Sequence, residues 1–274
     1  MFKKIFAGFV VFAAFVQANA QGDFKSSFSQ GRSAYHQGDY KNAVANYTKA
    51  LNFNPKSVAA YNNRGIAQKH MGKFTEAIKD FTSALNINPK HASSYYNRAN
   101  SKHDMRKFAS AIEDYTKALS YKPKDAKIYN NRGIAHSDMG NLKNAIKDFT
   151  SSLGLDKKNA TTYNNRGMAH AKKGNLPNAL KDFTSALNIN PKYGSAYYNR
   201  GVANQKLGNT EAAKKDMKKA KAIHPKYYKD LAMTSKFKGS TFKAQEKSFK
   251  AEDADFNKNP FDNQVKAFDN ESTF

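Results

Sequence analysis

The segment at residues 61–67 reads YNNRGIA; it recurs unchanged at 129–135 and returns as YNNRGMA at 163–169. These copies share one register, in which the tyrosines Tyr61, Tyr95, Tyr129, Tyr163 and Tyr197 fall in step. Their spacing, a period of about 34 residues, is typical of helix-turn-helix units that stack, because each unit is too small to bury its own apolar face. The sequence therefore predicts an all-α repeat fold.

Other positions of the same register explain how two helices would fit together. Small residues allow close approach of the helices; they stand at Ala43, Ala77, Ala111, Ala145, Ala179 and Ala213. Glycines between the two helices of a unit suit a turn of positive φ; they are Gly38, Gly72, Gly140, Gly174 and Gly208. Prolines such as Pro55 and Pro89 end the second helix.

This pattern of aromatic, glycine, alanine and proline positions resembles that of tetratricopeptide repeat proteins, with six repeats over residues 24–227. The resemblance implies a right-handed superhelical solenoid of helix-turn-helix repeats, in which the first helices line a concave groove. It also implies binding of a protein or peptide partner. It does not identify that partner, because one fold serves many functions.

One departure from the family pattern recurs in five repeats. Arginine stands where the family usually has leucine, and an aspartate follows it sixteen residues later. The pairs are Arg64 and Asp80, Arg98 and Asp114, Arg132 and Asp148, Arg166 and Asp182, and Arg200 and Asp216. Repeat one has neither member, because it carries Gln30 and Asn46. This joint change predicts a structural ion pair between the two helices of each repeat.

Asparagines form a second repeating row on the first helices: Asn63, Asn97, Asn131, Asn165 and Asn199, flanked by Tyr96, Asn130 and Asn164. An amide both donates and accepts, so such a ladder suits the backbone of an extended peptide. It resembles the asparagine ladder in the tetratricopeptide superhelix of the enzyme that attaches N-acetylglucosamine to serine and threonine. A second interpretation stays open, in which each asparagine binds the neighbouring repeat and sets the superhelical pitch.

The first twenty residues have the pattern of a signal peptide. Lys3 and Lys4 precede an apolar stretch at 5–16 and a small-residue cleavage site at 18–20. The stretch is too short to cross a bilayer, which takes about 20 residues. We therefore expect an exported chain, periplasmic or secreted, with no transmembrane segment after cleavage. Release from the cell to act on a host is an open alternative.

The net charge of +24, from 46 basic and 22 acidic residues, is concentrated in the repeats. An exported chain rarely meets nucleic acid, so we expect no nucleic-acid partner. Lysines recur in the loops between repeats, as at Lys56 and Lys90, and on second helices, as at Lys79. A solvated face is one interpretation of these lysines, and a basic surface that binds anionic membrane or polysaccharide is the alternative.

The C-terminal part leaves the repeat register. Residues 228–240 predict a capping helix, and residues 241–274 predict a disordered tail that contains spaced phenylalanines such as Phe242, Phe249 and Phe274. Docking of this tail on the groove stays open.

We find no pattern that predicts catalytic residues, a cofactor or a metal site. The chain has no cysteine and no glycine-rich phosphate loop, and the spacing of His36, His70 and His103 is a weak metal signal. The leading hypothesis is a non-enzymatic interaction scaffold of the cell envelope.

Overall fold

The computed structural model describes residues 22–225 of the 274-residue chain. All regular structure in this part is helical, as expected for a helix-turn-helix repeat protein. The predicted signal peptide (1–20), capping helix (228–240) and tail (241–274) lie outside the described residues. None of the described helices is both long and apolar enough to cross a membrane.

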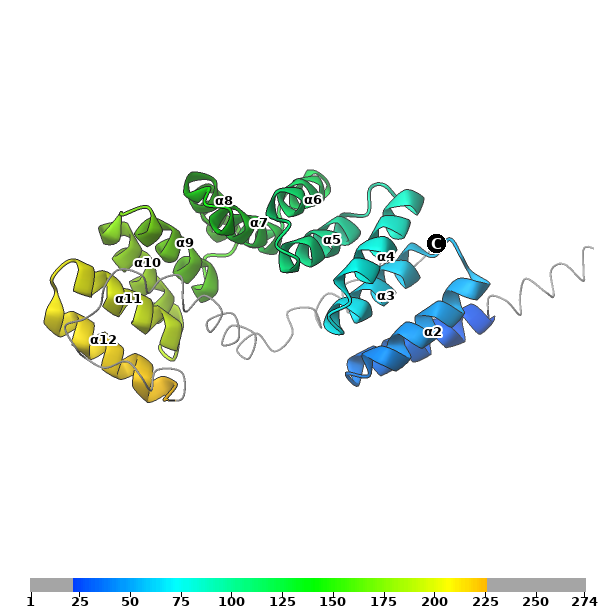
Figure 1. Ribbon diagram of the computed structural model, residues 1–274, viewed down its shortest axis with the longest axis horizontal. Helices are drawn as coiled ribbons and strands as arrows, with labels where there is room; N and C mark the ends of the chain where they lie inside the picture. The colour runs from blue at the N-terminus through cyan, green and yellow to red at the C-terminus, as the bar shows by residue number, and fades with distance from the viewer. Residues whose placement is uncertain (1–21, 226–274) are drawn as a thin grey trace, which may run out of the picture. The chain divides into compact units, whose positions relative to one another are not determined.

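The chain divides into two compact units between Ala135 and His136. The helices of the first unit are residues 22–36, α2 (Tyr40–Phe53), α3 (Val58–His70), α4 (Phe74–Ile87), α5 (Ala92–Asp104), α6 (Phe108–Tyr121) and most of α7 (Ala126–Asp138). Those of the second unit are α8 (Leu142–Leu155), α9 (Ala160–Lys172), α10 (Leu176–Ile189), α11 (Gly194–Lys206) and α12 (Thr210–Ile223). Figure 1 shows the helices in sequence order.

From α2 to α6 in the first unit and from α8 to α12 in the second, each helix packs on the next one in the chain. In the first unit α3 packs on α4 and α5 on α6, while α2 and α4 also contact the first helix of the following repeat. In the second unit α9 packs on α10 and α11 on α12. First helices of neighbouring repeats also touch, α3 with α5 and α9 with α11. Each unit therefore has a layer of first helices and a layer of second helices.

The core consists of the small and aromatic positions that recur once in every repeat. Ala77, Phe81 and Ala84 of α4 are fully buried, and their counterparts in α10 are buried in the same way. A Cβ atom added to Gly65 would lie 2.7 Å from the ring of Phe81. Such a distance is a steric clash, so the glycine is needed for the two helices to approach this closely.

The turn inside each repeat needs a residue of left-handed backbone conformation. Glycine takes that place in five repeats, with φ between 74° and 86°. Repeat three has Arg106 there instead, with φ of 60°. A residue with a side chain is strained in this conformation.

Candidate functional site

Four of the five arginines in the repeating row link the two helices of their own repeat. Arg64 on α3 donates from Nε to Asp80 Oδ2 at 2.8 Å and from Nη2 to Asp80 Oδ1 at 2.7 Å. The same two-bond geometry joins Arg98 to Asp114, Arg166 to Asp182, and Arg200 to Asp216. All four aspartates are buried. Arg132 and Asp148 belong to different units, so their pairing stays a prediction.

A third residue, which sequence analysis missed, connects each arginine to the preceding repeat. Arg64 Nη1 donates to Thr48 Oγ1 at 3.0 Å, and Arg98 Nη1 donates to Thr82 at the same distance. Thr116, Thr150 and Thr184 accept the corresponding bonds from Arg132, Arg166 and Arg200. The signal was present in the sequence, because these threonines recur in the repeat register directly after the buried aromatic position.

The first and sixth repeats each carry only some of these residues. Repeat one has the threonine but lacks the arginine and aspartate. Repeat six has the arginine and aspartate but carries Lys218 at the threonine position. The threonine of repeat one accepts a bond from the arginine of repeat two, and the arginine of repeat six donates to the threonine of repeat five.

A tyrosine completes the arrangement around each arginine. The guanidinium carbon of Arg64 lies 5.5 Å from the centre of the Tyr61 ring, within range of a cation–π interaction. The other four arginines have the same contact at 5.5 to 5.6 Å. The pKa of Arg64 is raised, mainly by its hydrogen bonds to Asp80, although burial acts in the opposite direction. The arginine is thus held in its charged form.

The predicted asparagine ladder connects neighbouring repeats. Asn97 Nδ2 donates to Asn62 Oδ1 of the preceding repeat at 3.1 Å, and Asn199 Nδ2 donates to Asn164 Oδ1 at 3.0 Å. Asn131 Nδ2 donates to the Tyr96 hydroxyl at 2.8 Å. In each case the partner lies 35 residues earlier in the chain.

The predicted peptide site includes buried residues. Four of its eight residues are buried, with 1 to 6% of their surface exposed: Tyr96, Asn97, Asn164 and Asn199. A buried amide that already binds the adjacent repeat does not offer its groups to a ligand. For these four residues the structure favours the interpretation of contacts between repeats. Burial also raises the pKa of Tyr96 to about 12.

The other four predicted residues are partly exposed: Asn63, Asn130, Asn131 and Asn165. Asn131 Oδ1 accepts one bond, from Asn130 Nδ2 at 3.1 Å, and Asn63 Oδ1 accepts one from Asn62 at 3.4 Å. An amide oxygen has two lone pairs. The oxygens of Asn63 and Asn131 can therefore each accept a further hydrogen bond.

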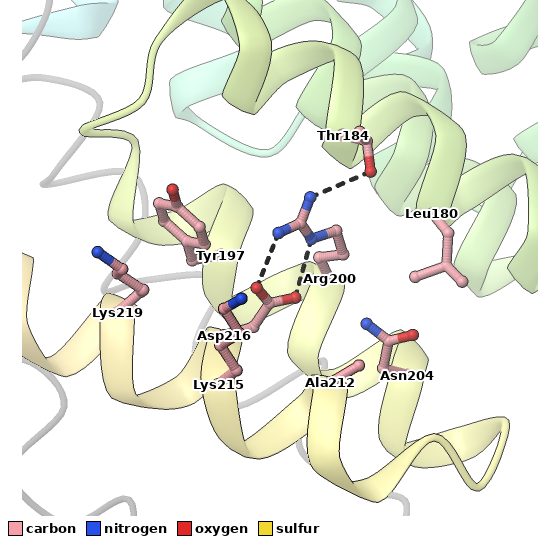
Figure 2. A pocket seen from close by; sticks show the side chains of 9 residues that line it. All are labelled: Leu180, Thr184, Tyr197, Arg200, Asn204, Ala212, Lys215, Asp216 and Lys219. Carbon is pink, nitrogen blue, oxygen red and sulfur yellow. Dashed lines mark hydrogen bonds and ion pairs between the residues drawn. The ribbon is translucent and has the colours of Figure 1, made fainter.

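A pocket of about 390 Å³ lies in the second unit among α10, α11 and α12. Figure 2 shows Arg200 at its centre, bound to Asp216 and Thr184, with Lys215 and Lys219 coming from α12. The pocket is lined by Leu180, Thr184, Tyr197, Arg200, Asn204, Ala212, Lys215, Asp216 and Lys219. None of these is a predicted peptide-binding residue, so this pocket is separate from the asparagine ladder.

Two of the histidines that gave a weak metal signal have other contacts. His70 Nε2 lies 3.0 Å from the Tyr35 hydroxyl, and its ring stacks on Tyr40 with centroids 4.7 Å apart. His103 packs against Phe108 at 5.2 Å between centroids. Within residues 22–225, no group of three His, Cys, Asp or Glu side chains is placed to hold a metal ion.

Comparison with known protein families identifies the repeat. A model described as TPR repeat matches residues 31–72 and 100–140. Two models described as tetratricopeptide repeat match 58–91 and 160–193, and 126–159 and 194–227. Together these matches span most of the chain. No curated protein matches the sequence significantly.

Solved structures share the fold at low sequence identity. The TPR protein YrrB, whose structure is described as having an unusual peptide-binding site, is 23% identical, with 66% of this chain and 93% of that chain covered and a TM-score of 0.56. A tetratricopeptide repeat protein from Parabacteroides merdae is 22% identical, with coverage of 74% and 80% and a TM-score of 0.65. The type IV pilus biogenesis factor PilW is 20% identical, with coverage of 74% and 94% and a TM-score of 0.68.

Proposed function

The chain belongs to the tetratricopeptide repeat family, and on that premise we propose that it is a non-enzymatic interaction scaffold of the cell envelope. Its layer of first helices binds an extended segment of a partner protein. The repeat fold suits it to protein-protein interaction, because stacked repeats present a long and regular surface.

One observation carries the proposal: the amide oxygens of Asn63 and Asn131 are partly exposed and each has an acceptor position left. The N–H group of Asn131 donates to the Tyr96 hydroxyl of the preceding repeat. The ladder thus supplies acceptors to the backbone N–H groups of a peptide, whatever side chains that peptide has. The sequence pattern predicted that both the N–H and the oxygen of each amide bind the ligand. The proposal is now that the oxygens of Asn63 and Asn131 bind it.

Charge distribution supports a neutral ligand surface on the first helices. The repeated arginines are bound to aspartates of the second helices, so the ion pairs lie between the two layers. On α3 the exposed Ala59 lies one turn before Asn63. A small side chain at this place leaves room for a ligand backbone beside the amide.

Similarity to YrrB agrees with the proposal only at the level of the fold, since the two chains are 23% identical. The envelope location rests on the signal-peptide pattern of residues 1–20. Release from the cell is the alternative location, and fractionation of the producing cells separates the two.

A blocking substitution tests the proposed surface without removing a hydrogen bond. Ala59→Trp places a large ring beside Asn63, while Ala45→Trp makes the same change on α2, at another exposed alanine. The immobilised full chain is incubated with envelope extract, and the captured proteins are identified by mass spectrometry. We expect the partner to be lost with Ala59→Trp and retained with Ala45→Trp. Equal capture by both variants would exclude the first-helix layer as the binding surface.

A further inference from the structure

In the first unit, large apolar side chains protrude at one repeated position of the second helices. Phe53, Ile87 and Tyr121 are the last residues of α2, α4 and α6, and 43%, 38% and 40% of their surfaces are exposed. The second unit repeats the feature by itself, with Leu155 ending α8 and Ile189 ending α10 at 45% and 39% exposure. A large apolar side chain is therefore exposed at this position in five repeats.

A lysine follows each of these side chains by three residues, in the loop to the next repeat. Lys56, Lys90 and Lys124 are all exposed, and none has an ion-pair partner among residues 22–225. We call the six residues Phe53, Ile87, Tyr121, Lys56, Lys90 and Lys124 the linker edge. These residues occupy the same position in three consecutive repeats, and regular stacking of repeats places equivalent positions along the same edge of the unit.

The loops of the linker edge are positively charged. The three loops, 54–57, 88–91 and 122–125, contain four lysines and one aspartate, a net charge of +3. The aspartate, Asp125, accepts hydrogen bonds from the backbone N–H groups of Lys127 and Ile128, at 2.9 and 3.3 Å. Its carboxylate is therefore directed to the start of α7, and the lysines set the sign of the edge.

The chemistry of the apolar row distinguishes among anionic partners. Single-stranded nucleic acids are bound by aromatic side chains on which bases stack. The exposed apolar residues of the linker edge instead combine Phe53 and Tyr121 with the aliphatic Ile87. A lipid surface binds both types of side chain, because its interface accommodates aromatic rings and its acyl region accommodates aliphatic groups. Lysines beside such groups are attracted by anionic headgroups.

We propose that the linker edge of the first unit docks on an anionic lipid surface, with its lysines at the headgroups and its apolar side chains entering the interface. This activity is separate from peptide binding, because it uses the ends of second helices and the loops rather than the layer of first helices. A scaffold with both surfaces would hold its partner at a membrane.

Vesicle co-sedimentation tests the proposal with matched variants. The full chain and the chain lacking residues 1–20 are mixed with vesicles of phosphatidylcholine alone, or of phosphatidylcholine with phosphatidylglycerol. Lys56→Gln, Lys90→Gln and Lys124→Gln are combined in one variant. The control combines Lys49→Gln, Lys79→Gln and Lys117→Gln, which removes the same charge from the second helices. A third variant combines Phe53→Ser, Ile87→Ser and Tyr121→Ser.

We expect binding to the anionic vesicles and little to the neutral ones. The loop variant should weaken this binding more than about tenfold, because lysines near an anionic surface are attracted by its headgroups. The control should weaken it much less. The serine variant should dissociate at a lower salt concentration than the parent chain. If the loop variant and the control lost the same amount of vesicle binding, the binding would depend only on total charge. If the serine variant bound vesicles like the parent chain, the apolar side chains would not enter the interface. Either result overturns the proposal. Circular dichroism checks that each variant is folded.

Discussion

At the scale of single residues, the repeated polar side chains join helices to one another. Each of the four described ion pairs combines a buried aspartate with an arginine that also reaches a threonine of the preceding repeat. A charged group in such a place is stable only while its partner is present. The consequence is a strong dependence of stability on both members of a pair.

Replacement of Arg166 by methionine tests this dependence. Arg166→Met leaves the Asp182 carboxylate buried without its two donors, so we expect the free energy of unfolding to fall by about 3 kcal/mol in urea denaturation. Thr150→Val removes only the single bond to Arg166 Nη1 and should cost about 1 kcal/mol or less. The double variant Arg166→Met/Asp182→Leu should recover part of the loss. Equal costs for the two single variants would contradict this role for the ion pair.

The strained turn of repeat three predicts a stabilising substitution. Arg106→Gly should raise the free energy of unfolding by about 1 kcal/mol, because glycine adopts positive φ without a steric penalty. The reverse change, Gly72→Arg at the same place in repeat two, should be destabilising by a similar amount. Thermal unfolding of both variants checks the prediction, and a lower stability of Arg106→Gly would show that the arginine makes a contact worth more than the strain.

His170 predicts a dependence of stability on pH. Burial lowers the pKa of His170 below 6.5, Asp182 raises it, and Arg166 lowers it further. The folded state favours the neutral ring of His170. The stability that depends on this neutral ring is therefore fully present above pH 6.5 and is lost as the pH falls below that value. His170→Gln should therefore reduce the loss of stability in acid, and Gln68 already occupies the same place in repeat two. A His170 pKa above 6.5 in an NMR titration would contradict the prediction.

At the scale of helices, the close contact between the glycine of the first helix and the aromatic ring of the second limits which residues can replace that glycine. A Cβ atom on Gly167 would lie 2.7 Å from the Phe183 ring, whereas one on Gly154, near the end of α8, would meet no atom within 4 Å. Repeat three has Ala99 at the position of Gly167 and Tyr115 at the position of Phe183. Nothing in the structure explains how this repeat accommodates the methyl group.

The two glycines give a matched pair of substitutions. Gly167→Ala should lower the free energy of unfolding by about 1 to 3 kcal/mol, because the ring must move. Gly154→Ala should raise it by about 0.5 to 1 kcal/mol, because alanine restricts the unfolded chain and favours the helix. Both values follow from urea denaturation. A loss in Gly154→Ala equal to that in Gly167→Ala would contradict the packing argument.

The helix pattern was predictable from the sequence because every packing position recurs in the same register from repeat to repeat. The Arg and Asp pattern was predictable because both residues change together in repeat one. The burial of Asn97 was not, because periodicity places a residue on a helix face without showing what the adjacent helix brings to it. Asn97 meets Asn62, a contact that depends on the offset between neighbouring repeats.

At the scale of the whole molecule, the side chains that hold the repeats together differ from those proposed to face a partner. Within residues 22–225 most lysines are exposed, while the first helices carry the repeated asparagines and small side chains such as Ala59. Within each unit the same arrangement recurs from repeat to repeat. This regularity is the physical basis for a surface that binds an extended chain.

Site-specific photo-crosslinking in the producing cells tests the central claim, that a partner lies on the layer of first helices. A photoreactive phenylalanine analogue is placed at Ala59 on α3, or at Ala45 on α2 as the control. We predict a crosslinked protein from Ala59 and none from Ala45. Crosslinks from Ala45 alone would place the partner on the second helices and contradict the proposed function.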